Sequence, residues 1–153
     1  MIKEESSITD PKLREAFDQL RNTIAGEPIA EAIRDRGTRI RFGKARRNSF
    51  SQFDALFNEI TINNRCRDAS PAALAAHLAH EGTHLLWDEP NSIEQEYDAF
   101  SAEAAVWSEL RGDDRDKQCD LVLAMINQGE REARRQIRRL YPELPEHGFF
   151  REE

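Results

Sequence analysis

The sequence has few of the residues that mark several common classes of protein. It contains only two cysteines, Cys66 and Cys119, which are too few for a disulfide framework. No apolar run approaches the roughly 18 residues that cross a bilayer, and the first residues lack the apolar core of a secretory signal. These features predict a cytoplasmic protein without a membrane partner.

Positive charge is also scarce relative to negative charge. The chain has 22 Lys and Arg against 29 Asp and Glu, a net charge of −7. Because non-specific binding to nucleic acid needs a basic stripe, we expect no nucleic-acid partner. With 153 residues, 39% of them apolar, the chain is long enough for one domain with a sizeable core, and residues 1–8 and 143–153 are candidate flexible tails.

Histidine is also scarce, and the spacing of the few histidines suggests a metal site. There are four in the chain, and His77, His80 and His84 lie within eight residues. His80-Glu81-Gly82-Thr83-His84 is an H-E-x-x-H pattern. On a helix, residues four apart share a face, so two imidazoles can bind Zn²⁺ while positions stay open for a third ligand and a water. Glu81 would then stand beside the metal as the general base.

A helix around this pattern is predicted by its flanks. Ser70-Pro71 is typical of a helix start, and Leu74, Leu78 and Leu85 form an apolar stripe. The alternative is an exposed polar face that carries histidine by chance, but the surrounding leucines and alanines disfavour it. Gly82 costs about 1 kcal/mol relative to Ala in a helix interior, which a need for close packing near the site would explain.

A second helix follows after a tight turn at residues 88–91. Ser92 is its expected cap, and apolar residues recur at helical spacing as far as Trp107. Glu96 and Glu103, seven residues apart, fall at the edge of the apolar arc. A carboxylate in that position needs a partner or a metal, because burying it alone is expensive.

The short turn makes the second helix run back along the first. Glu96 should then lie at the height of His84, and Glu103 about 10 Å further along, nearer His77 and His80. We therefore expect Glu96 to be the third ligand. Glu103 and His77 are expected to lie beside the ligands, where Glu103 would accept a hydrogen bond from a metal-bound imidazole. The exchange of roles between Glu96 and Glu103 stays open.

The residues before the metal helix predict a small sheet. Residues 38–42 and 58–63 alternate polar and apolar side chains, and residues 48–54 form a candidate strand between them. The expected fold is α+β, mostly helical, with a small antiparallel sheet preceding the metal-binding helix. An edge strand of this sheet could hold an extended peptide, or the sheet could merely cover the helix.

Two helices are expected after Gly112, over residues 113–128 and 130–140. Tyr141 and His147 are candidate hydrogen-bond donors to a transition-state oxyanion. Phe149 and Phe150 could pack on the body of the protein or lie in the cleft and block it.

The two histidines, the glutamates and Trp107 together resemble the gluzincin zinc metallopeptidases. The resemblance is greatest to the smallest members of that clan, the minigluzincins, and looser to the regulatory peptidases that cleave phage-type repressors. It covers roughly residues 58–110 and implies a zincin-like fold, with zinc held by His80, His84 and Glu96 and with Glu81 as general base. The sequence departs from the clan's fuller pattern, since no Asn precedes the glutamate and no Ser-Asp pair follows it at the usual positions.

Three functions are compatible with these residues. The leading hypothesis is a zinc-dependent peptidase that acts on a peptide or protein substrate through a zinc-activated water. The alternative is a latent or non-catalytic zinc-binding regulatory protein on a peptidase-like fold. In the third, no metal is bound and the two helices serve only to bind a partner.

Overall fold

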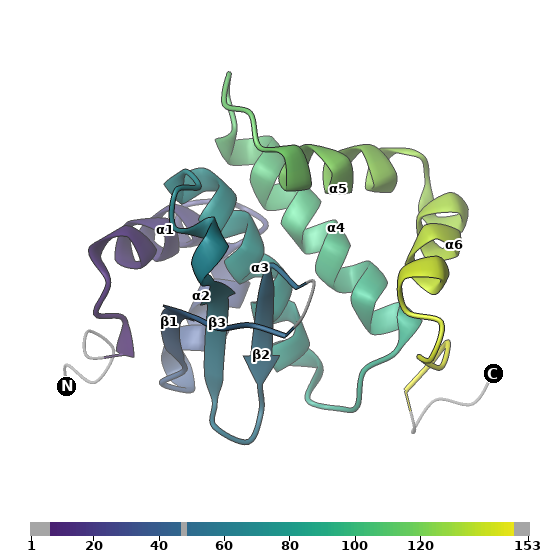
Figure 1. Cartoon of the computed structure of the whole chain (residues 1–153), viewed down its shortest axis with the longest axis horizontal. Helices are drawn as coiled ribbons and strands as arrows, with labels where there is room; N and C mark the ends of the chain where they lie inside the picture. Colours follow the sequence, from purple (N-terminus) through teal and green to yellow (C-terminus); the bar gives the residue numbers. More distant parts are fainter. Residues whose placement is uncertain (1–6, 47–48, 149–153) are drawn as a thin grey trace.

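A computed structural model describes residues 7–46 and 49–148 and shows an α+β fold dominated by helices (Figure 1). The helices are α1 (Pro11–Arg21), α2 (Glu27–Asp35), α3 (Pro71–Trp87), α4 (Ile93–Leu110), α5 (Lys117–Asn127) and α6 (Glu130–Leu140). The strands are β1 (Arg39–Gly43), β2 (Ser51–Asp54) and β3 (Glu59–Asn63). None of the helices in the described ranges has both the length and the apolarity needed to cross a membrane. The predicted fold class is confirmed at this level.

The sheet differs from the predicted antiparallel one. Its strand order is β1–β3–β2, with β3 antiparallel to β2 but parallel to β1. β2 and β3 form a hairpin whose turn ends at Asn58, a residue with a left-handed φ of 50°. β2 does not pair with β1 but lies at the far edge of the sheet. β3 therefore occupies the central position and runs parallel to β1. Alternating side chains report the faces of a strand and not its neighbours, which is why the sequence did not reveal the mixed sheet.

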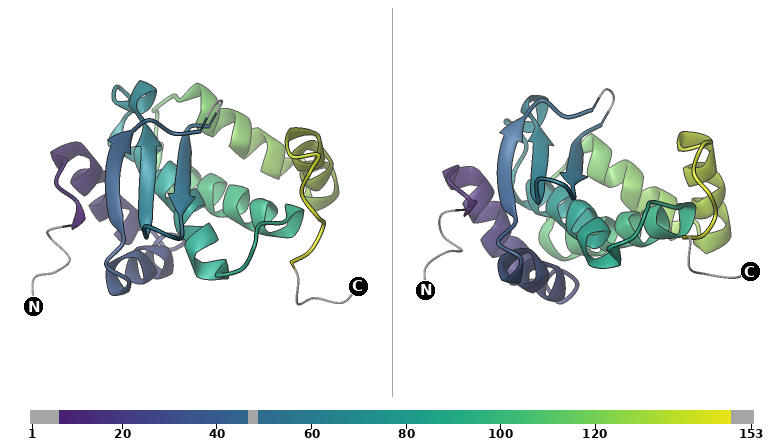
Figure 2. Two further views of the ribbon diagram at one scale, coloured as in Figure 1. Left: turned by 60° about the horizontal axis from the view of Figure 1, so that its bottom comes forward. Right: turned by 90° about the horizontal axis from the view of Figure 1, so that it is seen from below.

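Helix α3 occupies the centre of the molecule. It contacts α1 and α2, the antiparallel helix α4, and strands β2 and β3. Figure 2 shows the sheet covering one side of this helix layer. The Ser70 side chain accepts a hydrogen bond from Ala73 N and so caps the helix, and Pro71 follows at the first position. Most of α3 is buried on every side, because its many alanines let neighbouring elements approach closely.

Gly82 lies where side chains of α2 pack directly against the backbone of α3. A Cβ atom at this position would lie 2.3 Å from Cγ2 of Ile29 and 3.1 Å from Cδ1 of Ile33. Any larger residue would force Ile29, and with it the packing of α2 on the helix that carries the histidines, to shift. The glycine inside the H-E-x-x-H pattern therefore has a packing role.

Helix α4 lies between α3 on one side and α5 and α6 on the other. Asp88 ends α3 in a left-handed conformation, and the Ser92 side chain caps α4 by accepting from Gln95 N. The C-terminal segment returns to the start of α4, where the carbonyls of Pro145 and Glu146 accept hydrogen bonds from Ile93 N and Glu94 N. Of the candidate tails, residues 143–148 are thus attached to α4. Phe149 and Phe150 lie outside the described residues.

Candidate metal centre

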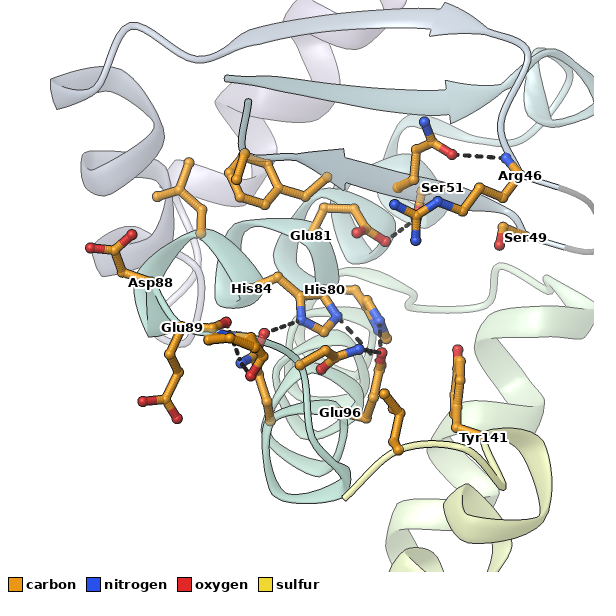
Figure 3. A pocket seen from close by; sticks show the side chains of 18 of the residues that line it. Arg46, Ser49, Ser51, His80, Glu81, His84, Asp88, Glu89, Glu96 and Tyr141 are labelled. Atoms are coloured by element: carbon orange, nitrogen blue, oxygen red, sulfur yellow. Dashed lines mark hydrogen bonds and ion pairs between the residues drawn. The ribbon is translucent and has the colours of Figure 1, made fainter. Parts of the chain in front are cut away.

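Three side chains from α3 and α4 converge on one point. His80 and His84 lie one turn apart on α3, and Glu96 faces them from the first turn of α4. Oε1 of Glu96 is 3.1 Å from Nε2 of His80 and 3.4 Å from Nε2 of His84. One ligand atom from each residue lies within 4.8 Å of the other two, so this buried group could hold a metal ion (Figure 3).

The far nitrogen of each imidazole is held by another side chain. Nδ1 of His80 lies 2.9 Å from Oε1 of Glu103, and Nδ1 of His84 lies 2.7 Å from Oε1 of Gln95. Each Nδ1–H can donate to its oxygen, so Nε2 is the nitrogen directed at the common point and can bind a metal once its own proton has left. Metal-binding histidines are commonly oriented by partners of this kind.

Glu96 is oriented in the same manner. Its Oε2 accepts a hydrogen bond of 2.7 Å from Nδ2 of Asn91, in the turn between the helices. Its Oε1 is therefore the oxygen that faces the two histidines. Glu103 instead reaches the opposite nitrogen of His80, so the structure gives the two carboxylates different neighbours.

The charged forms of the two histidines and of Glu96 stabilise one another. Burial alone would lower the pKa of His80, but its hydrogen bonds to Glu103 and Glu96 outweigh burial and raise the pKa well above its usual value. Burial also opposes the charged form of His84, whose pKa is nevertheless raised by Glu96. Burial would raise the pKa of Glu96, but the two histidines hold that pKa below its usual value. A metal ion at this point would have to displace protons from the imidazoles.

Glu81 stands next to His80 and is also buried. Its Oε2 accepts a hydrogen bond of 2.5 Å from the Ser51 hydroxyl on β2. Figure 3 shows the Glu81 side chain between the histidines and Ser51. The Ser51 hydroxyl orients the Glu81 carboxylate through Oε2, so Oε1 is not used in this hydrogen bond.

The centre opens into a cleft of about 1070 Å³, called here the metal cleft. Strand β2, the α3–α4 turn and residues 141–144 form its walls. Among the described strands β2 pairs only with β3, so no described strand pairs with its other edge. Tyr141 also lines the cleft, and burial together with nearby carboxylates such as Glu96 raises the pKa of its hydroxyl, which stays protonated.

The remaining two histidines have other surroundings. Nδ1 of His147 lies 2.8 Å from Oε2 of Glu94, and His147 does not line the metal cleft. Glu94 and Glu96 are two residues apart and therefore point to different sides of α4. The contact with Glu94 keeps His147 away from His80, His84 and Glu96. His77 stacks on Phe50, with ring centroids 5.8 Å apart, and it is not one of the groups bonded to the ligand imidazoles.

Sequence reasoning missed three residues that orient the group. Gln95 adjoins Glu96 on a buried turn, so a search for buried amides beside the predicted ligand would have found it. Asn91 lies in the predicted turn at residues 88–91, where a polar residue is expected whether or not it contacts a ligand. Ser51 gives no local signal, because only the packing of β2 on α3 brings it to Glu81.

Comparisons with models of protein families, with curated proteins and with solved structures gave no significant match to this chain. The resemblance to gluzincins therefore rests on the residues described above.

Proposed function

We propose that this chain is a zinc-dependent peptidase. The observation that carries the proposal is the convergence of Nε2 of His80, Nε2 of His84 and Oε1 of Glu96, with Glu81 alongside them in an open cleft. The donor set fits zinc, which favours imidazole nitrogen and carboxylate oxygen and keeps one position open in catalytic sites. When bound there, zinc would polarise a peptide carbonyl and lower the pKa of a water.

Glu81 is the residue proposed to move the proton. With one oxygen held by Ser51, its carboxylate is oriented before substrate arrives. It would accept a proton from the attacking water and deliver it to the nitrogen of the leaving amine. Two proton transfers by one carboxylate account for the role of Glu81 without a second acid.

Strand β2 and Tyr141 are proposed to hold the substrate. The edge of β2 that pairs with no described strand offers backbone groups that can pair with an extended peptide. The Tyr141 hydroxyl, kept protonated in the same cleft, can donate a hydrogen bond to the carbonyl oxygen as negative charge develops there.

Two measurements on untagged protein test the proposal. Elemental analysis should find zinc at one ion per chain, and a mixture of unstructured peptides should be hydrolysed. Glu81→Gln keeps the size of the side chain but removes the base, so zinc content and folding should be unchanged while turnover falls by about 10²–10⁴-fold. Full zinc occupancy without turnover in the wild type would instead favour the regulatory alternative, and absence of metal would exclude both.

A further inference from the structure

A second cavity lies on the inner side of His80, and we call it the inner cavity. Its volume is about 410 Å³, and its lining comes from α3, α4, α5, α6 and the residues around the start of β2. It adjoins the metal cleft, with which it shares five lining residues: Ser49, Ser51, His80, Glu81 and Tyr141. The shared residues include Glu81, the proposed base, and His80, a proposed metal ligand. A substrate side chain in the inner cavity would therefore belong to a residue close to the bond that is cut.

The walls of the inner cavity combine apolar residues with polar ones such as Gln118 and Gln136. The apolar lining residues are Phe50, Phe100, Leu121, Val122, Met125 and Leu140. The volume is near the lower end for ligand sites, so it suits one long side chain better than a folded segment of peptide. The apolar residues match the methylene stem of such a side chain.

Glu103 supplies a polar group with unused capacity in this lining. The residue is 3% exposed, and its Oε1 is bonded to His80. Its Oε2 is buried and has no hydrogen-bond partner among the described residues. A buried carboxylate oxygen without a donor is costly, so a ligand that brings a donor would gain from meeting it.

The charge of the lining favours a cation over a neutral donor. Glu81 and Glu103 both belong to the described lining, which holds no Lys or Arg, and the imidazole of His80 that pairs with Glu103 can balance only one of these two carboxylates. A cationic donor to a carboxylate also makes a stronger hydrogen bond than a neutral one. The cavity therefore combines apolar residues with a negative group.

We propose that the inner cavity binds the side chain of a Lys or Arg residue that flanks the scissile bond, with its cationic end paired to Glu103. The inference rests on the proposed peptidase function and adds the substrate class: peptides cleaved beside a basic residue. Glu103 thus acts both on His80 and on the substrate.

Matched host peptides test this substrate class on the zinc-loaded full chain. They differ at one position, which is Lys, Arg, norleucine or Glu, and mass spectrometry identifies the bond that is cut. Norleucine has the same straight-chain stem as Lys but no ammonium group. We expect kcat/KM to be about tenfold or more higher for Lys than for norleucine, and lowest for Glu. Norleucine cleaved as well as Lys would overturn the proposal.

Three variants locate the effect. Leu121 is 58% exposed, so Leu121→Lys should fold and place a competing cation at the cavity, reducing the Lys-to-norleucine ratio. Ile24→Lys, at a position 88% exposed and outside both linings, is the matched control and should leave the ratio unchanged. Glu103→Gln keeps an oxygen for His80 but loses the charge, so the ratio should approach one even if zinc affinity also changes. An unchanged ratio in both Leu121→Lys and Glu103→Gln would contradict the assignment.

A binding measurement separates this inference from the proposed function. Nα-acetyl-lysinamide and Nα-acetyl-norleucinamide, which differ in charge only at the side chain, are titrated into the metal-free wild type while the Met125 methyl signal is followed by NMR. The lysine derivative should shift this signal at concentrations about tenfold lower than the norleucine derivative. If no peptide is hydrolysed but this selectivity is present, the peptidase proposal fails and the cation site stands. Equal binding, or no response at Met125, would overturn the cation site whether or not peptides are cleaved.

Discussion

Helix α4 presents two buried glutamates to the same histidine, and the regions around them differ. Glu96, in the first turn, is 4% exposed, and Glu103, two turns later, is 3% exposed. Glu96 reaches Nε2 of His80, and its other oxygen is held by Asn91. Glu103 reaches Nδ1 of the same ring, and its other oxygen has no partner among the described residues.

The difference shows that burial and residue type do not define the role of a carboxylate. What distinguishes the two is the imidazole nitrogen that each one faces and the partner of its second oxygen. A carboxylate at Nε2, with both oxygens engaged, can complete a metal site. A carboxylate at Nδ1 orients the ring and, at Glu103, retains capacity for a further group.

The largest effect is expected when Glu96 is removed. Glu96→Ala deletes the oxygen that faces both histidines, and two imidazoles seldom hold zinc alone. Zinc should be lost on dialysis, as measured by elemental analysis, while circular dichroism reports retained helices. His77→Ala is the matched control, because His77 is also a buried residue of α3 but offers no ligand atom to the group, and it should keep its zinc. Stoichiometric zinc in Glu96→Ala would remove the distinction between the two glutamates.

Acidification should weaken zinc binding steeply. The neighbouring carboxylates raise the pKa of both His80 and His84, so each imidazole keeps its second proton to a higher pH than a free histidine does, and zinc must displace that proton. Below those pKa values the apparent affinity should fall as the pH falls, by up to about 100-fold per pH unit for two displaced protons. Titration with a competing chelator at several pH values measures the slope. A flat profile would mean that the imidazoles are already neutral in the free protein.

Removing Glu103 should have a smaller effect on the metal than removing Glu96. Glu103→Ala leaves all three ligand atoms in place but frees the His80 ring, at an expected cost of about 10–100-fold in zinc affinity. The pH dependence should also become shallower, because the hydrogen bond from Glu103 helps to raise the pKa of His80. If Glu103→Ala loses zinc and Glu96→Ala keeps it, the two roles are exchanged.

The positions of these glutamates could be anticipated because helical spacing is regular. The start of α3, the short turn and a spacing of seven between Glu96 and Glu103 set the heights of the side chains along two antiparallel helices. The mixed sheet could not be anticipated, since alternation in β1 and β3 carries no information on which strand lies between the others. Contacts such as Ser51 with Glu81 depend on that strand order and were missed with it.

The smallest effect is expected at Asn91, which makes the sharpest test of the comparison. Asn91→Ala removes the donor to Oε2 of Glu96, so Glu96 would then resemble Glu103 in having one unpartnered oxygen. The ligand oxygen itself remains, and its loss of orientation should weaken zinc binding by about tenfold or less, the lower end of the effect of an outer partner. Asn91→Asp is the informative companion, because it keeps the shape but places a second carboxylate against Glu96 and should weaken binding at neutral pH more than the alanine does. Chelator competition on both variants measures the ranking. Zinc loss in Asn91→Ala as complete as that in Glu96→Ala would mean that the turn, and not the Glu96 oxygen alone, forms the site.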